Sequence, residues 1–66
     1  MIDWSNRNDV VELARVLAGE DRPQIVYKVR TKAYYCLCPP DSWPRRMDEF
    51  LRQDLELDFL LTVDAP

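Results

Sequence analysis

The chain has 66 residues, of which 47% are hydrophobic and 32% are charged, and its formal net charge at neutral pH is −3. A chain of this length forms one domain, residues 1–66, and buries only about 60% of the surface that its unfolded form exposes. The apolar content excludes a disordered tail, and the absence of histidine removes the commonest general base and the commonest metal ligand.

The first predicted element is an α-helix over residues 8–19. Its apolar residues recur at intervals of three and four: Val10, Leu13, Ala14 and Leu17. This spacing places them on one face of a helix. We expect Ser5, Asn6 or Asn8 to cap its start, and Gly19 to end it in the left-handed conformation.

Residues 24–38 predict a β-hairpin. They are rich in β-branched and aromatic side chains, and a polar triplet at 30–32 divides them into two strands. On the first strand, Ile25 and Tyr27 share one face and Val26 lies on the other. The hairpin lacks the Asn-Gly or Asp-Gly pair of the tightest turns, which favours a loop of three or more residues and leaves the register open.

A second helix follows the proline-rich residues 39–44, capped by Asp41 or Ser42 and with Pro44 in its first turn. Its apolar residues gather on one side: Trp43, Met47, Phe50 and Leu51. Residues 55–63 then carry apolar side chains at every second position, which predicts a strand with one buried face.

The predicted order of elements is therefore α-β-β-α-β. We expect an α+β fold in which a three-stranded sheet has both helices packed on one face. A right-handed crossover through the second helix brings the last strand parallel to the second strand, beside either strand of the hairpin.

Cys36 and Cys38 are the candidates for metal chemistry. Zinc normally takes four ligands, whereas the chain offers two thiols without histidine, so we expect no metal site. Alternate residues of a strand lie roughly 6.5 Å apart, too far for an easy disulfide, which predicts two buried, reduced thiols. The single glycine excludes glycine-rich phosphate loops. We therefore expect no cofactor and no enzymatic activity.

The start of the chain lacks a cationic segment followed by an apolar one, and no later run of aliphatic or aromatic residues, 59–61 included, is longer than three. These features predict a cytoplasmic protein without a membrane partner.

Charge is distributed unevenly along the chain. Residues 22–46 hold six basic residues and one acid, whereas residues 47–66 hold six acids and one arginine. In one hypothesis the acidic end imitates nucleic acid and binds a basic surface of another protein, and the candidates are Asp48, Glu49, Asp54, Glu56 and Asp58. The last three share the outward face of the final strand, spaced by roughly 6.5 to 7 Å, and we expect all five to face water.

Two other interpretations remain open. The basic, aromatic hairpin is able to track a nucleic-acid backbone and stack bases, and its candidates are Lys28, Arg30, Lys32, Tyr34 and Tyr35. The negative net charge opposes this direct binding of nucleic acid. In the third interpretation, Glu56 and Asp58 simply form ion pairs across the sheet with Lys28 and Arg30.

A very short, acidic α/β chain without catalytic equipment resembles the small anti-CRISPR proteins that phages make. The resemblance lies in size, acidity and lack of catalytic residues, and it includes no motif. It implies an inhibitor that mimics DNA and blocks the DNA-binding or PAM-reading site of a CRISPR effector subunit in the host cytoplasm. We therefore expect a non-enzymatic interaction protein that is a monomer or a weak homodimer.

Overall fold

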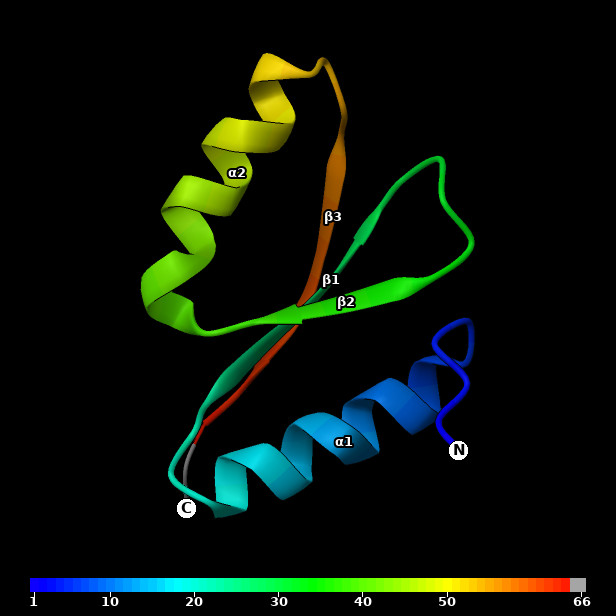
Figure 1. Cartoon of the computed structure of the whole chain (residues 1–66), viewed down its shortest axis with the longest axis vertical. Helices are drawn as coiled ribbons and strands as arrows, with labels where there is room; N and C mark the ends of the chain where they lie inside the picture. Colours follow the sequence, from blue (N-terminus) through cyan, green and yellow to red (C-terminus); the bar gives the residue numbers. More distant parts are fainter. Residues whose placement is uncertain (65–66) are drawn as a thin grey trace.

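The computed structural model describes residues 1–64 of the chain (Figure 1). In chain order its elements are α1 (Arg7–Gly19), β1 (Gln24–Val29), β2 (Tyr35–Cys38), the 3-10 turn η1 (Pro40–Ser42), α2 (Trp43–Arg52) and β3 (Leu57–Val63). The predicted α+β class and the order α-β-β-α-β are confirmed.

The start of α1 is capped by Asn6, one of the three predicted candidates. Its Oδ1 accepts hydrogen bonds from the backbone N–H groups of Asn8, at 2.9 Å, and Asp9, at 3.3 Å. The predicted end is wrong in detail, because Gly19 stays helical and Asp21 takes the left-handed conformation, with φ at 63°. Asp tolerates this region because its short polar side chain hydrogen-bonds locally.

The start of α2 also differs from the prediction. Pro44 lies in the first turn as expected, but the side chain of Ser42 makes no capping hydrogen bond. Pro39, at the N-cap position of η1, makes none either. The chain enters α2 through η1, where the backbone N–H of Ser42 donates to the carbonyl of Pro39 at 3.0 Å. Because Ser42 already has helical φ and ψ, it lacks the extended backbone from which a capping side chain acts.

The sheet has the order β2-β1-β3, and both of its pairings are antiparallel. Ile25 pairs with Cys38 and Lys28 with Tyr35, so the connection between β1 and β2 exceeds two residues, as predicted. Since β2 and β3 are each antiparallel to β1, β3 runs in the direction of β2, as expected from the crossover. The tertiary structure places β1 between them.

A β-bulge interrupts β3. Val26 is paired with Leu61, but the next residue of β1, Tyr27, is paired with Phe59, so Leu60 is an extra residue in β3. The extra residue reverses the alternation, because Phe59 shares a face with Tyr27 whereas Leu61 shares a face with Val26. The prediction that the alternate apolar residues of this strand share one buried face is therefore wrong.

The two helices cover opposite faces of the sheet. On one face, the buried cluster comprises Val10 and Ala14 of α1 with Val26 of β1. On the other face, Ile25, Tyr27 and Cys38 pack with half-buried side chains that include Trp43 and Phe50 of α2. Figure 1 shows the strands crossing the centre of the molecule, with α1 below them and α2 above.

The prediction that both helices pack on one face is therefore wrong. The reason lies in β1, where Ile25, Val26 and Tyr27 are consecutive and all buried. Successive side chains of a strand point to opposite faces, so a central strand of this kind requires cover on both sides.

Candidate functional site

The outer side of α2 is a candidate interaction surface, because the helix is held to the sheet by only part of its apolar side chains. The ring of Tyr27 lies 5.1 Å from that of Trp43 and 6.4 Å from that of Phe50, measured between centroids. Met47 and Leu51 were expected on the same side of the helix as Trp43 and Phe50. These two residues are 48% and 74% exposed. The sheet therefore leaves two large apolar side chains of α2 uncovered.

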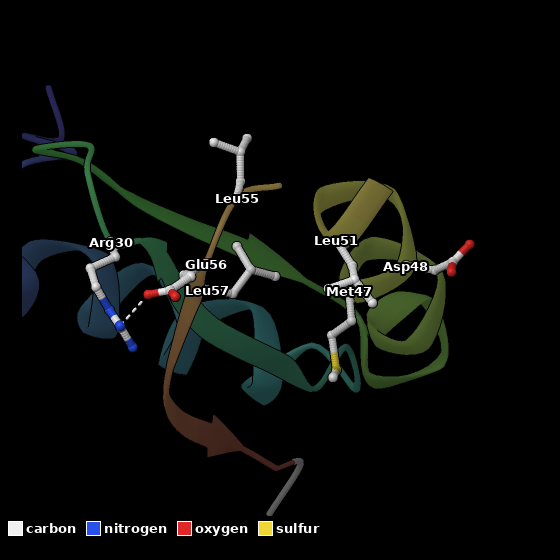
Figure 2. Close-up of a pocket in the computed structure, with 7 residues that line it drawn as sticks. All are labelled: Arg30, Met47, Asp48, Leu51, Leu55, Glu56 and Leu57. Atoms are coloured by element: carbon white, nitrogen blue, oxygen red, sulfur yellow. Dashed lines mark hydrogen bonds and ion pairs between the residues drawn. The ribbon is translucent and has the colours of Figure 1, made fainter. Parts of the chain in front are cut away.

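A groove of about 510 Å³ lies between α2 and β3. Its apolar walls are formed by Met47, Leu51, Leu55 and Leu57. Figure 2 shows Met47 and Leu51 of α2 facing Leu57 of β3 across this space. Phe59, two residues further along β3, is 55% exposed, and its ring lies 5.9 Å from that of Trp43. We call Met47, Leu51, Leu55, Leu57 and Phe59 the α2–β3 groove surface.

Charged side chains flank this groove surface. Asp48, Arg30 and Glu56 also line the groove, but Figure 2 shows the carboxylate of Asp48 pointing away from it. In the same view, Arg30 and Glu56 lie on the side of β3 that is remote from α2, joined by an ion pair.

Arg30 connects two of the predicted recognition acids. Its guanidinium pairs with Glu56, and its Nη2 lies 3.0 Å from Oδ1 of Asp58. The hydrogen bond to Asp58 and the charges of both carboxylates raise the pKa of Arg30. The cross-sheet interpretation is therefore confirmed for Arg30. It is wrong for Lys28, whose Nζ donates to the carbonyls of Val29, at 3.3 Å, and Arg30, at 3.0 Å.

The remaining predicted acids are placed differently from one another. Asp48 forms an ion pair with Arg52 at 3.1 Å, and Glu49 lies 4.0 Å from Arg46. Asp54 has no ion pair among residues 1–64.

The predicted row of three acids on one strand face is wrong. Asp54 lies in the turn after α2 with φ at 57°, and β3 begins only at Leu57. Four of the five acids are exposed as expected, whereas Asp58 is half-buried. Of the three acids predicted to form this row, only Glu56 and Asp58 lie close together, and both form an ion pair with Arg30.

The candidates for nucleic-acid binding do not form one surface. Lys28 is half-buried and Arg30 is occupied by its two ion pairs. Tyr35 packs against the α1 cluster. Lys32 and Tyr34 are exposed in the connection between β1 and β2. Of the five predicted side chains, Lys32 and Tyr34 are thus the two that are exposed and form no ion pair within residues 1–64.

Cys36 and Cys38 are both free thiols, and Cys38 is buried whereas Cys36 is half-buried. Burial raises the pKa of each thiol, which disfavours the reactive thiolate. Burial also raises the pKa of the neighbouring Tyr27 to about 12. Within residues 1–64, no three potential metal ligands gather.

Sequence reasoning missed most of the groove surface as a functional candidate. It grouped Met47 and Leu51 with the core of α2, and no local signal revealed that Phe59 is exposed. The apolar side of α2 has the width of an ordinary amphipathic stripe, so it gave no signal that Met47 and Leu51 are exposed.

Comparison with protein-family models, with curated proteins and with solved structures finds no match to this chain. Among the described residues, neither helix has the length and apolar character needed to cross a bilayer.

Proposed function

We propose that the protein is a non-enzymatic interaction protein that binds a basic surface of another protein through α2 and β3. The observation that carries the proposal is the groove surface, where Met47, Leu51 and Phe59 are exposed beside a segment rich in acids. From the start of α2 to the end of β3, residues 43–63 hold five acids and three arginines. Exposed apolar patches flanked by polar residues mark interaction sites, and their buried centres dominate the binding energy.

The internal ion pairs do not prevent the acids from contributing to recognition. Glu56 and Arg30 have side chains that are 69% and 59% exposed, and such pairs add little to stability. Arg30 pairs with both carboxylates, and Lys28, the cross-strand neighbour of Asp58, carries a second cation on the same face of the sheet. Glu56 is the more exposed of the two carboxylates and is therefore the one that a cation of the partner reaches most easily.

The narrower form of the proposal is an anti-CRISPR-type inhibitor in the host cytoplasm that mimics DNA and occupies a DNA-binding or PAM-reading site. It is supported by the small size and acidity of the chain and by the exposure of Asp48, Glu49, Asp54 and Glu56. A mimic competes with nucleic acid for one basic site, so the partner releases bound DNA when this protein is added.

The proposal is tested with a partner captured from host lysate, identified by mass spectrometry and purified. The variant Asp48→Lys/Glu49→Lys changes two acids of α2. The matched control Glu12→Lys/Glu20→Lys changes two exposed acids at α1 by the same net charge; the α2 variant loses the ion pairs of Asp48 and Glu49, and the control loses that of Glu12. We expect the α2 variant to slow association at least tenfold and to weaken its salt dependence, because complementary charge mainly sets the on-rate.

Equal effects of the two double variants would show that net charge alone matters, and would contradict a binding face at α2 and β3. A stable ternary complex of partner, protein and DNA would contradict the DNA-mimic form. Direct binding of short oligonucleotides by the isolated protein, lost on changing Lys32 to Glu, would instead support nucleic-acid binding through the hairpin.

A further inference from the structure

The free edge of β3 lies beside the groove surface. The outer edge of β2 is partly covered, because the backbone N–H of Tyr35 donates to the carbonyl of Trp4 at 2.8 Å. Among residues 1–64, β3 pairs only with β1, and no other segment makes a backbone hydrogen bond to residues 57–63. The outer N–H and C=O groups of β3 are therefore available to pair with an added strand.

We propose that the partner segment recognised by this protein is an extended peptide with alternating apolar and basic residues, which adds to the free edge of β3. This inference rests on the proposed function and specifies the chemistry of the partner at the same surface. Main-chain hydrogen bonds to the edge strand provide affinity, and side chains of alternate residues provide specificity.

The apolar half of the pattern follows from the face of β3 that α2 covers. Leu57 and Phe59 lie on this face, and a strand added beside them continues the sheet alongside α2 at a spacing of roughly 4.8 Å. Every second side chain of the added strand then meets the exposed parts of Met47 and Leu51. The bulge at Leu60 confines this match to the first half of β3, so a short segment suffices.

The basic half of the pattern follows from the opposite face. Asp58 alternates with Leu57 and Phe59, so it points to the other side of the sheet, where it shares Arg30 with Glu56. The intervening side chains of the added strand lie beside these carboxylates, whereas Lys28 and Arg30 approach them from the β1 side, away from the free edge. Opposite charges on neighbouring strands attract, which favours lysine or arginine at these positions.

Charge also decides against a second copy of the chain as the occupant. In the antiparallel register that pairs all seven residues of β3 with those of a second copy, Leu60 faces its own counterpart. Glu56 then lies opposite Asp64 of the other copy, twice per dimer, and each copy carries a net charge of −3. Like charges that face each other across strands are destabilising.

The experiment titrates the isotopically labelled protein with a capped heptapeptide of alternating lysine and valine, followed by NMR. Two control peptides have the same length: one with lysines and valines in separate blocks, and one with glutamate in place of lysine. A third carries N-methyl groups on the amides that would pair with β3. For the alternating peptide we expect saturable binding that shifts the amide signals of residues 57–59. Each control peptide is expected to bind at least tenfold more weakly; for the N-methyl peptide the reason is the loss of main-chain hydrogen bonds.

Two protein variants locate the site. Leu51→Ser removes the most exposed member of the groove surface and is expected to weaken binding about tenfold. Val16→Ser is the matched control on the exposed side of α1, where Val16 is 60% exposed, and is expected to change affinity less than twofold.

Dissociation constants above about 1 mM, equal binding of the N-methyl peptide, or shifts confined to α1 or to residues 30–34 would overturn the inference. Dimerisation of the protein through β3, detected by light scattering, would overturn it too. If the peptide fails while Asp48→Lys/Glu49→Lys still impairs binding of the captured partner, the strand addition is wrong and the proposed function stands. If the peptide binds as expected while that variant leaves partner binding unchanged, the peptide site is supported and the proposed function is contradicted.

Discussion

Replacement of Val26 by alanine tests the placement of the two helices. Val26 lies on the central strand and is fully buried, in one cluster with Val10 and Ala14 of α1. If both helices lay on the other face of the sheet, Val26 would face water and its replacement would cost little. Because α1 and α2 lie on opposite faces of the sheet, α1 covers Val26 and makes it a core residue.

The expected loss follows from the atoms removed. Val26→Ala deletes two carbon groups from a fully buried site, which costs about 1.6 kcal/mol at about 0.8 kcal/mol per buried group. The cavity left behind adds to this, so we expect a total decrease of about 2 to 3 kcal/mol in the free energy of unfolding. A domain of this size is stable by about 3 to 10 kcal/mol, so the loss is a large fraction of the whole.

Urea unfolding followed by circular dichroism measures the effect. With a slope of about 1 kcal/mol per molar urea, the midpoint for Val26→Ala should fall by about 2 M. Val16→Ala removes the same atoms from an exposed position of α1, and we expect a change within about 0.5 kcal/mol. Equal losses for the two variants, or a loss below about 1 kcal/mol for Val26→Ala, would refute the assignment of Val26 to the core between α1 and the sheet.

Two further predictions concern the cap of α1 and the buried tyrosine. Asn6→Ala should lower the free energy of unfolding by about 1 kcal/mol, because Asn6 accepts two backbone hydrogen bonds, whereas Asn8→Ala should cost clearly less in the same urea assay. Burial raises the pKa of Tyr27 from 10.0 to about 12, so between these values the unfolded state loses its proton first and stability falls as pH rises, by at most about 1.4 kcal/mol per pH unit. Tyr27→Phe should flatten this decrease, and the exposed Tyr34→Phe should not; equal slopes would contradict the burial of the Tyr27 hydroxyl.

Local sequence determined the elements of this protein and their order. The spacing of Val10 and Ala14 marks α1, the β-branched and aromatic residues of 24–38 mark the hairpin, and the prolines of 39–44 mark the break before α2. These features act through backbone preferences and side-chain periodicity over a few neighbouring residues, so they can be recognised in the sequence without the tertiary structure.

Tertiary structure decided what the helices and the acids contact. An amphipathic helix reveals that one side is buried, but not which face of a sheet buries it. The bulge at Leu60 arises from pairing with β1 and reverses the direction of every later side chain of β3. Arg30 meets Glu56 and Asp58 only because β1 and β3 are neighbours. These contacts join residues far apart along the chain, and local periodicity carries no information about such distances.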